Sequence, residues 1–193
     1  MRGVQTAAQT SDGFAPQALS QMKWAPFPLP GTQDQGGISQ PCRLLNSPTS
    51  RCGSIIAATV VAQHFHAYTP EQRAHGRTAD VEGPITFELM AADTIEFIET
   101  VIGEPVFLVG CSDGAVVALT VALTRPDLVR RLAFVAGVFH HGGWAAGVLD
   151  GEPPDFLEQS YAELSPDGPD HYQVVVGKLA AMHAPNPTSR RRR

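Results

Sequence analysis

The stretch VFLVGCSDGAVVAL, residues 106–119, decides how the rest of this 193-residue chain is interpreted. Its first part is an apolar run typical of a buried strand, and its last part is rich in Ala, Val and Leu and typical of a helix. Between them lies a Gly-x-Ser-x-Gly pentapeptide, residues 110–114, which we call the serine turn. Gly110 and Gly114 allow a tight approach of strand and helix, so that Ser112 is exposed at the carboxyl edge of the sheet. We therefore predict that Ser112 is a nucleophile.

The residues on either side of Ser112 have predicted roles of their own. A helix that starts behind the serine directs backbone N–H groups and the positive end of its dipole at the turn, so the Asp113 N–H is the expected donor to an oxyanion. Cys111 is expected to line the pocket as a small residue, not to act as the nucleophile. The alternative, a surface turn that happens to hold two glycines and a serine, leaves the buried strand and the following helix unexplained.

Composition limits the class of protein. The hydrophobic content of 43% and the charged content of 17% are ordinary for one globular domain. A formal net charge of -5 disfavours nucleic-acid binding, and no apolar run reaches the ~18 residues of a membrane helix. The 3 cysteines are odd in number and lack metal-type spacing, which disfavours a disulfide framework. We expect a cytoplasmic protein that uses no cofactor and associates with neither nucleic acid nor a membrane.

The two ends of the chain differ from its middle. Residues 1–53 are rich in Gln, Ser, Thr, Pro and Gly and show no periodic apolar face, so we predict a disordered or loosely packed segment outside the core. Residues 186–193 end in four arginines and are predicted to form a flexible basic tail. Residues 55–62 suit a buried strand or a short core helix equally. His64 and His66 have a spacing that metals use, but with no third ligand nearby we predict no metal site.

The middle of the chain alternates between strand and helix patterns. Residues 87–102 have an amphipathic spacing, with Thr86 as a cap and Gly103 at the end, and residues 132–138 form another apolar strand. This alternation predicts a parallel sheet with crossover helices over residues 54–138. Residues 156–164 and 171–183 are predicted to be short helices.

Two histidines follow the last predicted strand. His140 and His141 come at its carboxyl end, where open α/β sheets bind ligands, so they are candidates for lining the substrate pocket. A passive turn explains them about equally well.

A second motif points to a family. The segment TPEQRAHGRT, residues 69–78 and here named the arginine loop, resembles the Pro-Asp-x-Arg-Gly-x-Gly-x-Ser loop of α/β-hydrolases. Glu71 stands where the family has Asp, and Ala74 where it has Gly. With the serine turn and the order of elements, residues 54–185 resemble this family, with a core over 54–138 and a partial helical cap over 139–185. The resemblance implies a serine hydrolase that attacks the carbonyl of a small-molecule ester, thioester or lactone.

The resemblance also implies groups that the sequence does not show. Family members have a His-Gly motif after an early strand, and residues 1–60 contain none. The catalytic acid and histidine follow the cap, whereas His171 and His183 fall in predicted cap helices and are poor candidates for the base. We therefore expect an incomplete α/β-hydrolase fold, truncated at both ends, with an exposed sheet edge open to self-association. The expected function is a serine hydrolase impaired by loss of the acid and His, and the alternative is a non-catalytic module that binds a ligand or partner.

Overall fold

The structure is a computed structural model of the chain, and it describes residues 23–27, 43–46, 64–140, 143–144, 147 and 153–184. The strands of the described part are β1 (Lys23–Phe27), β2 (Arg43–Asn46), β3 (Ala67–Glu71), β4 (Val106–Cys111) and β5 (Val129–Val135). Its helices are α2 (Phe87–Phe97), η1 (Ile98–Ile102), α3 (Asp113–Thr124), η2 (Pro126–Leu128), α4 (Asp155–Leu164), η4 (Pro169–His171) and α5 (Tyr172–His183).

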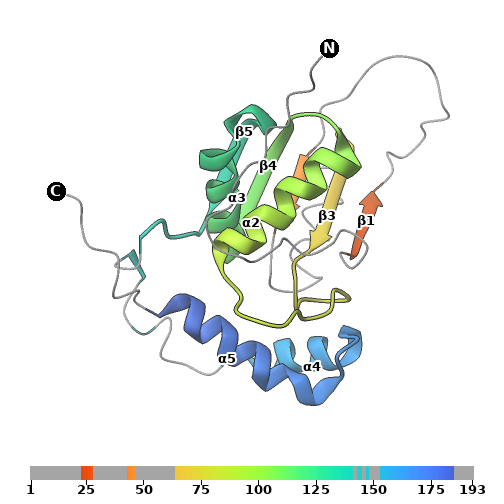
Figure 1. Cartoon of the computed structure of the whole chain (residues 1–193), viewed down its shortest axis with the longest axis vertical. Helices are drawn as coiled ribbons and strands as arrows, with labels where there is room; N and C mark the ends of the chain where they lie inside the picture. The colour runs from red at the N-terminus through yellow and green to blue at the C-terminus, as the bar shows by residue number, and fades with distance from the viewer. Residues whose placement is uncertain are drawn as a thin grey trace, which may run out of the picture.

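The strands form a sheet in the order β1-β3-β2-β4-β5 (Figure 1). Strand β2 pairs in parallel with β3 and β4, β4 pairs in parallel with β5, and β1 runs antiparallel to β3. The chain crosses from β3 to β4 through α2 and from β4 to β5 through α3. The predicted parallel sheet with crossover helices is therefore confirmed.

The prediction for residues 1–53 needs correction at two places. Strand β1 lies at one edge of the sheet, and β2 lies between β3 and β4. The sequence of β2, RLLN, is too short for an alternating pattern to stand out, and it is held by backbone pairing with strands from much later in the chain. The predicted element at 55–62 and the tail at 186–193 lie outside the described residues.

The strand after α3 begins earlier than predicted. We expected residues 132–138, whereas β5 spans Val129–Val135. The prediction left out Arg130 and Arg131 because charged residues are not typical of a buried strand. Both side chains are exposed, since β5 lies at the edge of the described sheet, where charged side chains reach water. The strand ends at Val135, directly before Ala136, which has a positive φ of 50°.

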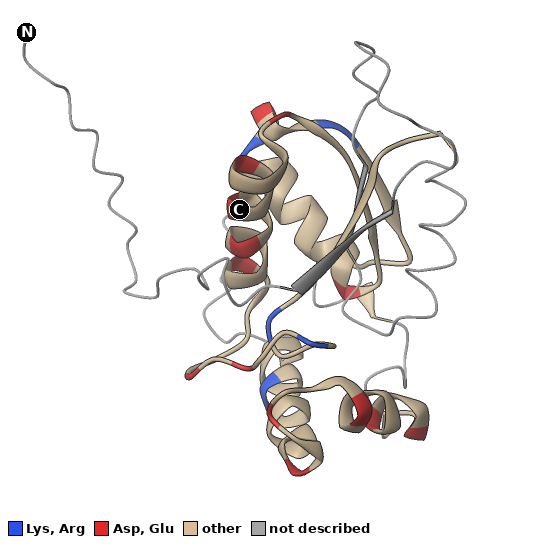
Figure 2. Cartoon of the chain, turned by 90° about the vertical axis from the view of Figure 1, so that its right-hand side faces the viewer, with Lys and Arg blue, Asp and Glu red and all other residues tan. Residues whose placement is uncertain are grey.

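Helix α2 shows why local sequence signals succeed here. The Thr86 hydroxyl accepts a hydrogen bond from the Leu89 N–H at 3.1 Å and caps the first turn, as predicted. The helix continues as the π-helical turn η1, which ends at Gly103 with a φ of 74°. In Figure 2, α2 and α3 lie on the same face of the sheet.

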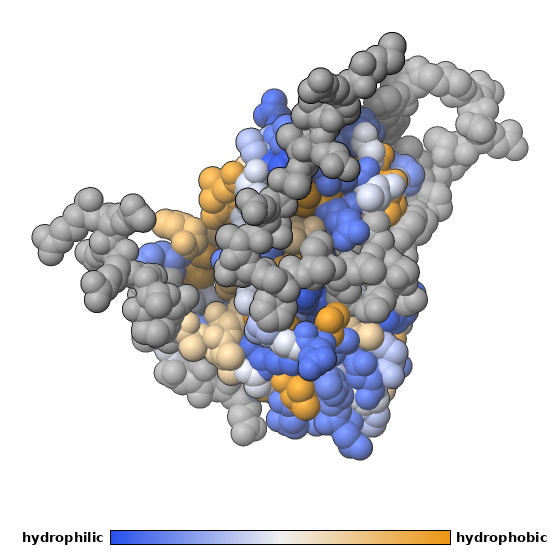
Figure 3. Space-filling model, in the orientation of Figure 1, coloured by the Kyte–Doolittle hydropathy of each residue, from blue (hydrophilic) through white to orange (hydrophobic). Residues whose placement is uncertain are grey.

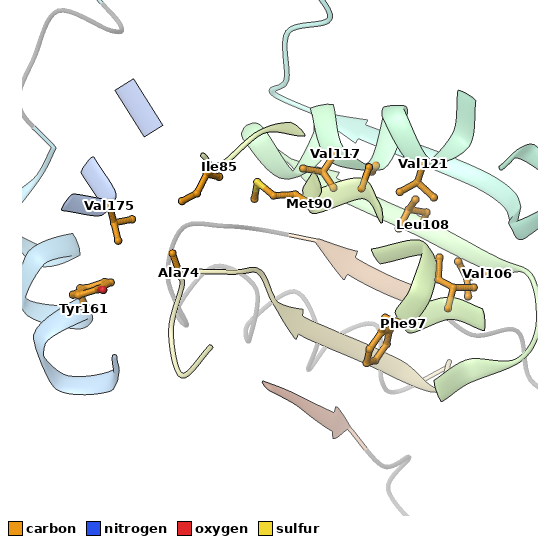
Figure 4. Packing of buried hydrophobic residues seen from close by; sticks show 13 residues of the cluster. Ala74, Ile85, Met90, Phe97, Val106, Leu108, Val117, Val121, Tyr161 and Val175 are labelled. Carbon is orange, nitrogen blue, oxygen red and sulfur yellow. The ribbon is translucent and has the colours of Figure 1, made fainter. Parts of the chain in front are cut away.

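The core fills the space between this sheet face and the helices, and it extends into the cap (Figure 4). Val106 and Leu108 of β4 pack with side chains of α2 and α3 in one buried cluster. Tyr161 of α4 and Val175 of α5 belong to the same cluster, and Figure 4 shows them beyond Ala74 of the arginine loop. The cap helices are therefore packed onto the core by apolar side chains.

Helices α4 and α5 confirm the two helices predicted for the cap. Their surface in the view of Figure 3 is largely hydrophilic. Helix α4 buries Tyr161 and leaves Phe156 exposed. In the described part of the chain, no helix is long and apolar enough to cross a membrane.

Candidate active site

Ser112 occupies a strained turn between β4 and α3. Its φ of 55° and ψ of -128° fall in a region that non-glycine residues rarely adopt. The Ser112 N–H donates to the Val135 carbonyl at 3.0 Å, and the Ser112 carbonyl accepts from the Ala115 N–H at 2.9 Å. These bonds tie the serine to β5 and to the first turn of α3, so the predicted strand, turn and helix are confirmed.

Glycine makes this turn possible. A Cβ on Gly110 would lie 2.2 Å from the Gly114 carbonyl oxygen and 2.6 Å from the Ala115 Cα. The sequence did not point to Gly137, where a Cβ would lie 2.6 Å from the Ala115 Cβ. Strand β4, helix α3 and the chain after β5 therefore approach one another closely around the serine.

Asp113 is the first residue of α3, and its N–H is free to bind a ligand oxygen. No acceptor for this N–H lies among the described residues. The first N–H groups of a helix lack intrahelical partners and carry the positive end of the helix dipole. This arrangement fits the predicted oxyanion donor, although the second donor stays unassigned in the described part of the chain.

The Asp113 side chain makes a contact that sequence reasoning missed. Both carboxylate oxygens lie 3.0 Å from Nε2 of His183, the last residue of α5. The two side chains are only 13% and 17% exposed. The imidazole also lies near two aromatic rings, with centroids 5.4 Å away for Trp144 and 6.0 Å for Phe87. His183 was considered a poor candidate because of its place in the cap, and no local pattern relates residues 70 positions apart.

His75 of the arginine loop is a second imidazole in the field of Asp113. Its Nδ1 lies 2.7 Å from the Arg73 carbonyl oxygen, which can only accept, so Nδ1 carries the hydrogen. Burial lowers the pKa of His75, and the backbone hydrogen bond and the charges of Asp113 and Asp80 only partly oppose this. The imidazole is therefore neutral at pH 7.

The arginine loop is fixed by buried polar contacts. Arg73 Nε donates to Asp93 Oδ2 at 2.8 Å and Arg73 Nη2 donates to Asp93 Oδ1 at 2.7 Å, with both side chains at most 5% exposed. Arg73 is therefore a buried, ion-paired residue and not a solvated loop residue. Glu71, which replaces the family's Asp, accepts from the Arg77 N–H at 2.7 Å. These contacts attach the loop to α2 and close it on itself.

A further polar cluster joins this loop to the cap. The Asp80 Oδ2 accepts from Lys178 Nζ at 2.6 Å and lies 2.8 Å from His171 Nε2. Lys178 Nζ also donates to the Val81 carbonyl at 2.8 Å, and the Asp80 N–H donates to Asp167 Oδ2 at 2.7 Å. Helix α5 is therefore held at the core by a carboxylate near each of its ends.

The remaining predicted site residues are less well placed. Cys111 and His140 are both exposed, and His141 lies outside the described residues. His66 stacks on Tyr68 at a centroid distance of 4.6 Å, and His64 is exposed. Within the described ranges, no three His, Cys, Asp or Glu side chains gather as metal ligands would.

Comparison with known proteins gives consistent results. The model of the alpha/beta hydrolase family matches residues 54–191. A curated hydrolase of Acinetobacter baylyi, (E)-2-((N-methylformamido)methylene)succinate hydrolase, is 32% identical over 78 residues, which cover 40% of this chain and 30% of that protein. This chain therefore matches less than a third of that relative's length.

Solved structures share the fold over a longer stretch. The meta-cleavage product hydrolase of Pseudomonas fluorescens superposes with a TM-score of 0.57 at 13% identity, over 86% of this chain and 61% of that one. The enol-lactonase of Burkholderia xenovorans superposes with a TM-score of 0.56 at 18% identity, over 84% of this chain and 64% of that one. The match of the family model covers more than half of the chain and includes both the arginine loop and the serine turn. The chain belongs to the alpha/beta hydrolase family.

Proposed function

We propose that this protein hydrolyses an ester or similar acyl bond of a small molecule through Ser112. The observation that carries the proposal is the strained conformation of Ser112 at the N-terminus of α3. Such a turn exposes the hydroxyl to substrate and brings the free Asp113 N–H beside it. The curated relative is named as a hydrolase, which supports the reaction class.

The choice of acyl chemistry rests on the nucleophile. A serine hydroxyl suits attack on a carbonyl carbon, whereas relatives that attack alkyl carbon use a carboxylate. The Ser112 oxygen forms a bond to the carbonyl carbon while the C=O π electrons move to the oxygen, which the Asp113 N–H then binds. Collapse of this intermediate expels the leaving group, and water releases the acid from the acyl-enzyme.

A second candidate is a non-catalytic module that binds a ligand or partner. The observation that favours it is the sheet, because among the described residues no strand follows β5 to present an acid and a histidine. Loss of triad residues costs on the order of 10⁴-fold or more in rate. The two candidates therefore differ in whether Ser112 is activated.

A fluorophosphonate probe separates the two, because it reacts only with an activated serine. We expect the wild-type protein to be labelled and Ser112→Ala to remain unlabelled at the same thermal stability. Equal lack of labelling in both proteins would reject the hydrolase and leave the binding module.

A further inference from the structure

The contact between Asp113 and His183 defines the hydrogen positions of the imidazole. A carboxylate only accepts hydrogen bonds, so Nε2 of His183 must carry the hydrogen that points at Asp113. In the neutral ring the other nitrogen, Nδ1, then has the lone pair. Among the described residues Nδ1 has no hydrogen-bond partner. A neutral His183 ring in this contact can therefore accept a proton at Nδ1.

The position of this imidazole is restricted. Asp113 directly follows Ser112, and consecutive Cα atoms are about 3.8 Å apart, so the carboxylate that holds the ring belongs to the serine turn itself. Trp144 meets the ring edge to face at an interplanar angle of 82°, and the Phe87 ring lies near it at an angle of 58°. Both partners of the pair are largely buried. Water therefore competes little for this hydrogen bond, and the ring has little freedom to turn.

We propose that His183 accepts the Ser112 proton during attack on the substrate and that the Asp113 carboxylate orients it, which rests on the proposed function. The Ser112 O–H bond breaks as Oγ bonds to the carbonyl carbon, and the proton passes to Nδ1 of His183. The imidazolium then returns this proton to the leaving-group oxygen as the acyl bond breaks. In the second half, Nδ1 takes a proton from the attacking water and gives it back to Ser112.

Charge balance also favours this assignment. A lone Asp113 carboxylate beside the oxyanion would oppose negative charge on the substrate. Protonated His183 cancels the charge of Asp113 at the moment when the oxyanion forms. The Asp113 residue then contributes a backbone donor to the oxyanion and a neutralised side chain, instead of an uncompensated charge.

His75 is the rival base in the described part of the site. Its Nδ1 hydrogen goes to the Arg73 carbonyl and not to a carboxylate, and the charges of Asp113 and Asp80 act on the ring without a hydrogen bond to it. Burial lowers its pKa and so disfavours the protonated form that a base must reach. His183 has the better partner for this task, and substitution of each histidine distinguishes them.

The test compares hydrolysis of a short nitrophenyl ester and fluorophosphonate labelling in His183→Ala, His75→Asn and a matched control. The control is His171→Ala, which removes another cap imidazole paired with a carboxylate, that of Asp80. We expect His183→Ala to lose about 10²–10⁴-fold in both rates, as for loss of a general base, and added imidazole to restore part of the loss. His171→Ala is expected to stay within about threefold of wild type, because weakening a cap contact removes no proton acceptor.

Three outcomes overturn the assignment. Activity of His183→Ala within threefold of wild type, loss in His75→Asn alone, or equal losses in His183→Ala and His171→Ala without imidazole rescue would each assign His183 a structural role or none. If His183→Ala fails to fold, Asp113→Asn takes its place, because it keeps the backbone N–H and the side-chain shape while removing the orienting charge. Absence of Ser112-dependent labelling in wild type would instead refute the proposed function, and the role of His183 with it.

Discussion

Replacement of Gly110 by alanine tests the close approach on which the serine turn depends. The added methyl would lie 2.2 Å from the Gly114 carbonyl oxygen and 2.6 Å from the Ala115 Cα, both of them backbone atoms. Contacts under 3.0 Å at a Cβ essentially never occur, so β4 and α3 would have to move apart. Overpacking typically costs about 1–3 kcal/mol, and we expect Gly110→Ala to cost about 3 kcal/mol because no flexible side chain can yield.

Thermal and urea unfolding measure this cost. At about 2–4 °C per kcal/mol for a domain of this size, the melting temperature should fall by roughly 6–12 °C. The matched control is Gly177→Ala on α5, where the glycine is exposed and nothing lies within 4 Å of the added Cβ. This second variant should gain about 0.5–1 kcal/mol, because alanine is the better helix former. Equal stability of Gly110→Ala and wild type would refute the close packing of the turn.

Three further predictions concern stability and association. Asp93→Asn should cost about 3–5 kcal/mol in urea unfolding, because it leaves the buried Arg73 charge without its carboxylate, and a cost below about 1 kcal/mol would contradict this. Burial raises the pKa of Asp80, but hydrogen bonds from the cap lysine and histidine outweigh it and hold the pKa below its ordinary value. The ionised Asp80 therefore stabilises the fold above the unfolded pKa of about 3.9. In urea unfolding, the free energy of unfolding of wild type should exceed that of Asp80→Asn near neutral pH, and this difference should shrink as pH falls through the folded pKa. Val135→Lys should weaken self-association through the edge strand β5 in sedimentation, whereas Val174→Lys, equally exposed on α5, should not.

Sequence reasoning succeeded where the signal is local. The cap at Thr86, the left-handed Gly103 and the pentapeptide around Ser112 each act within a few residues, and the structure has the predicted element at each of them. The two cap helices are also confirmed, since α4 and α5 begin and end within one residue of the predicted bounds. Local hydrogen bonding and backbone conformation determine these elements, so the sequence alone was sufficient.

Prediction failed where the determinant is non-local. Strand β2 is four residues long and becomes a strand through its neighbours β3 and β4, so its own sequence carries little signal. The partner of Asp113 is another such case, because only the docking of α5 brings His183 to the serine turn. The buried state of Arg73 likewise depends on Asp93, which lies 20 residues further along the chain.

The energetics of the cap connect its docking to the chemistry of the turn. In the described part of the chain, Val175 is the one fully buried side chain of α5, and burial of such a side chain contributes about 1.5–3 kcal/mol. Tyr172, Leu179 and Met182 of α5 pack against the core while partly exposed. The polar contacts of Asp80 and Asp113 with α5 join largely buried side chains and contribute about 1 kcal/mol each. Helix α5 thus buries fewer side chains than α2 or α3, as expected for an element that opens before the core unfolds. The backbone hydrogen bonds of Ser112 are made with β5 and α3, so we expect cap opening to remove an activity that needs His183 while the serine turn stays intact.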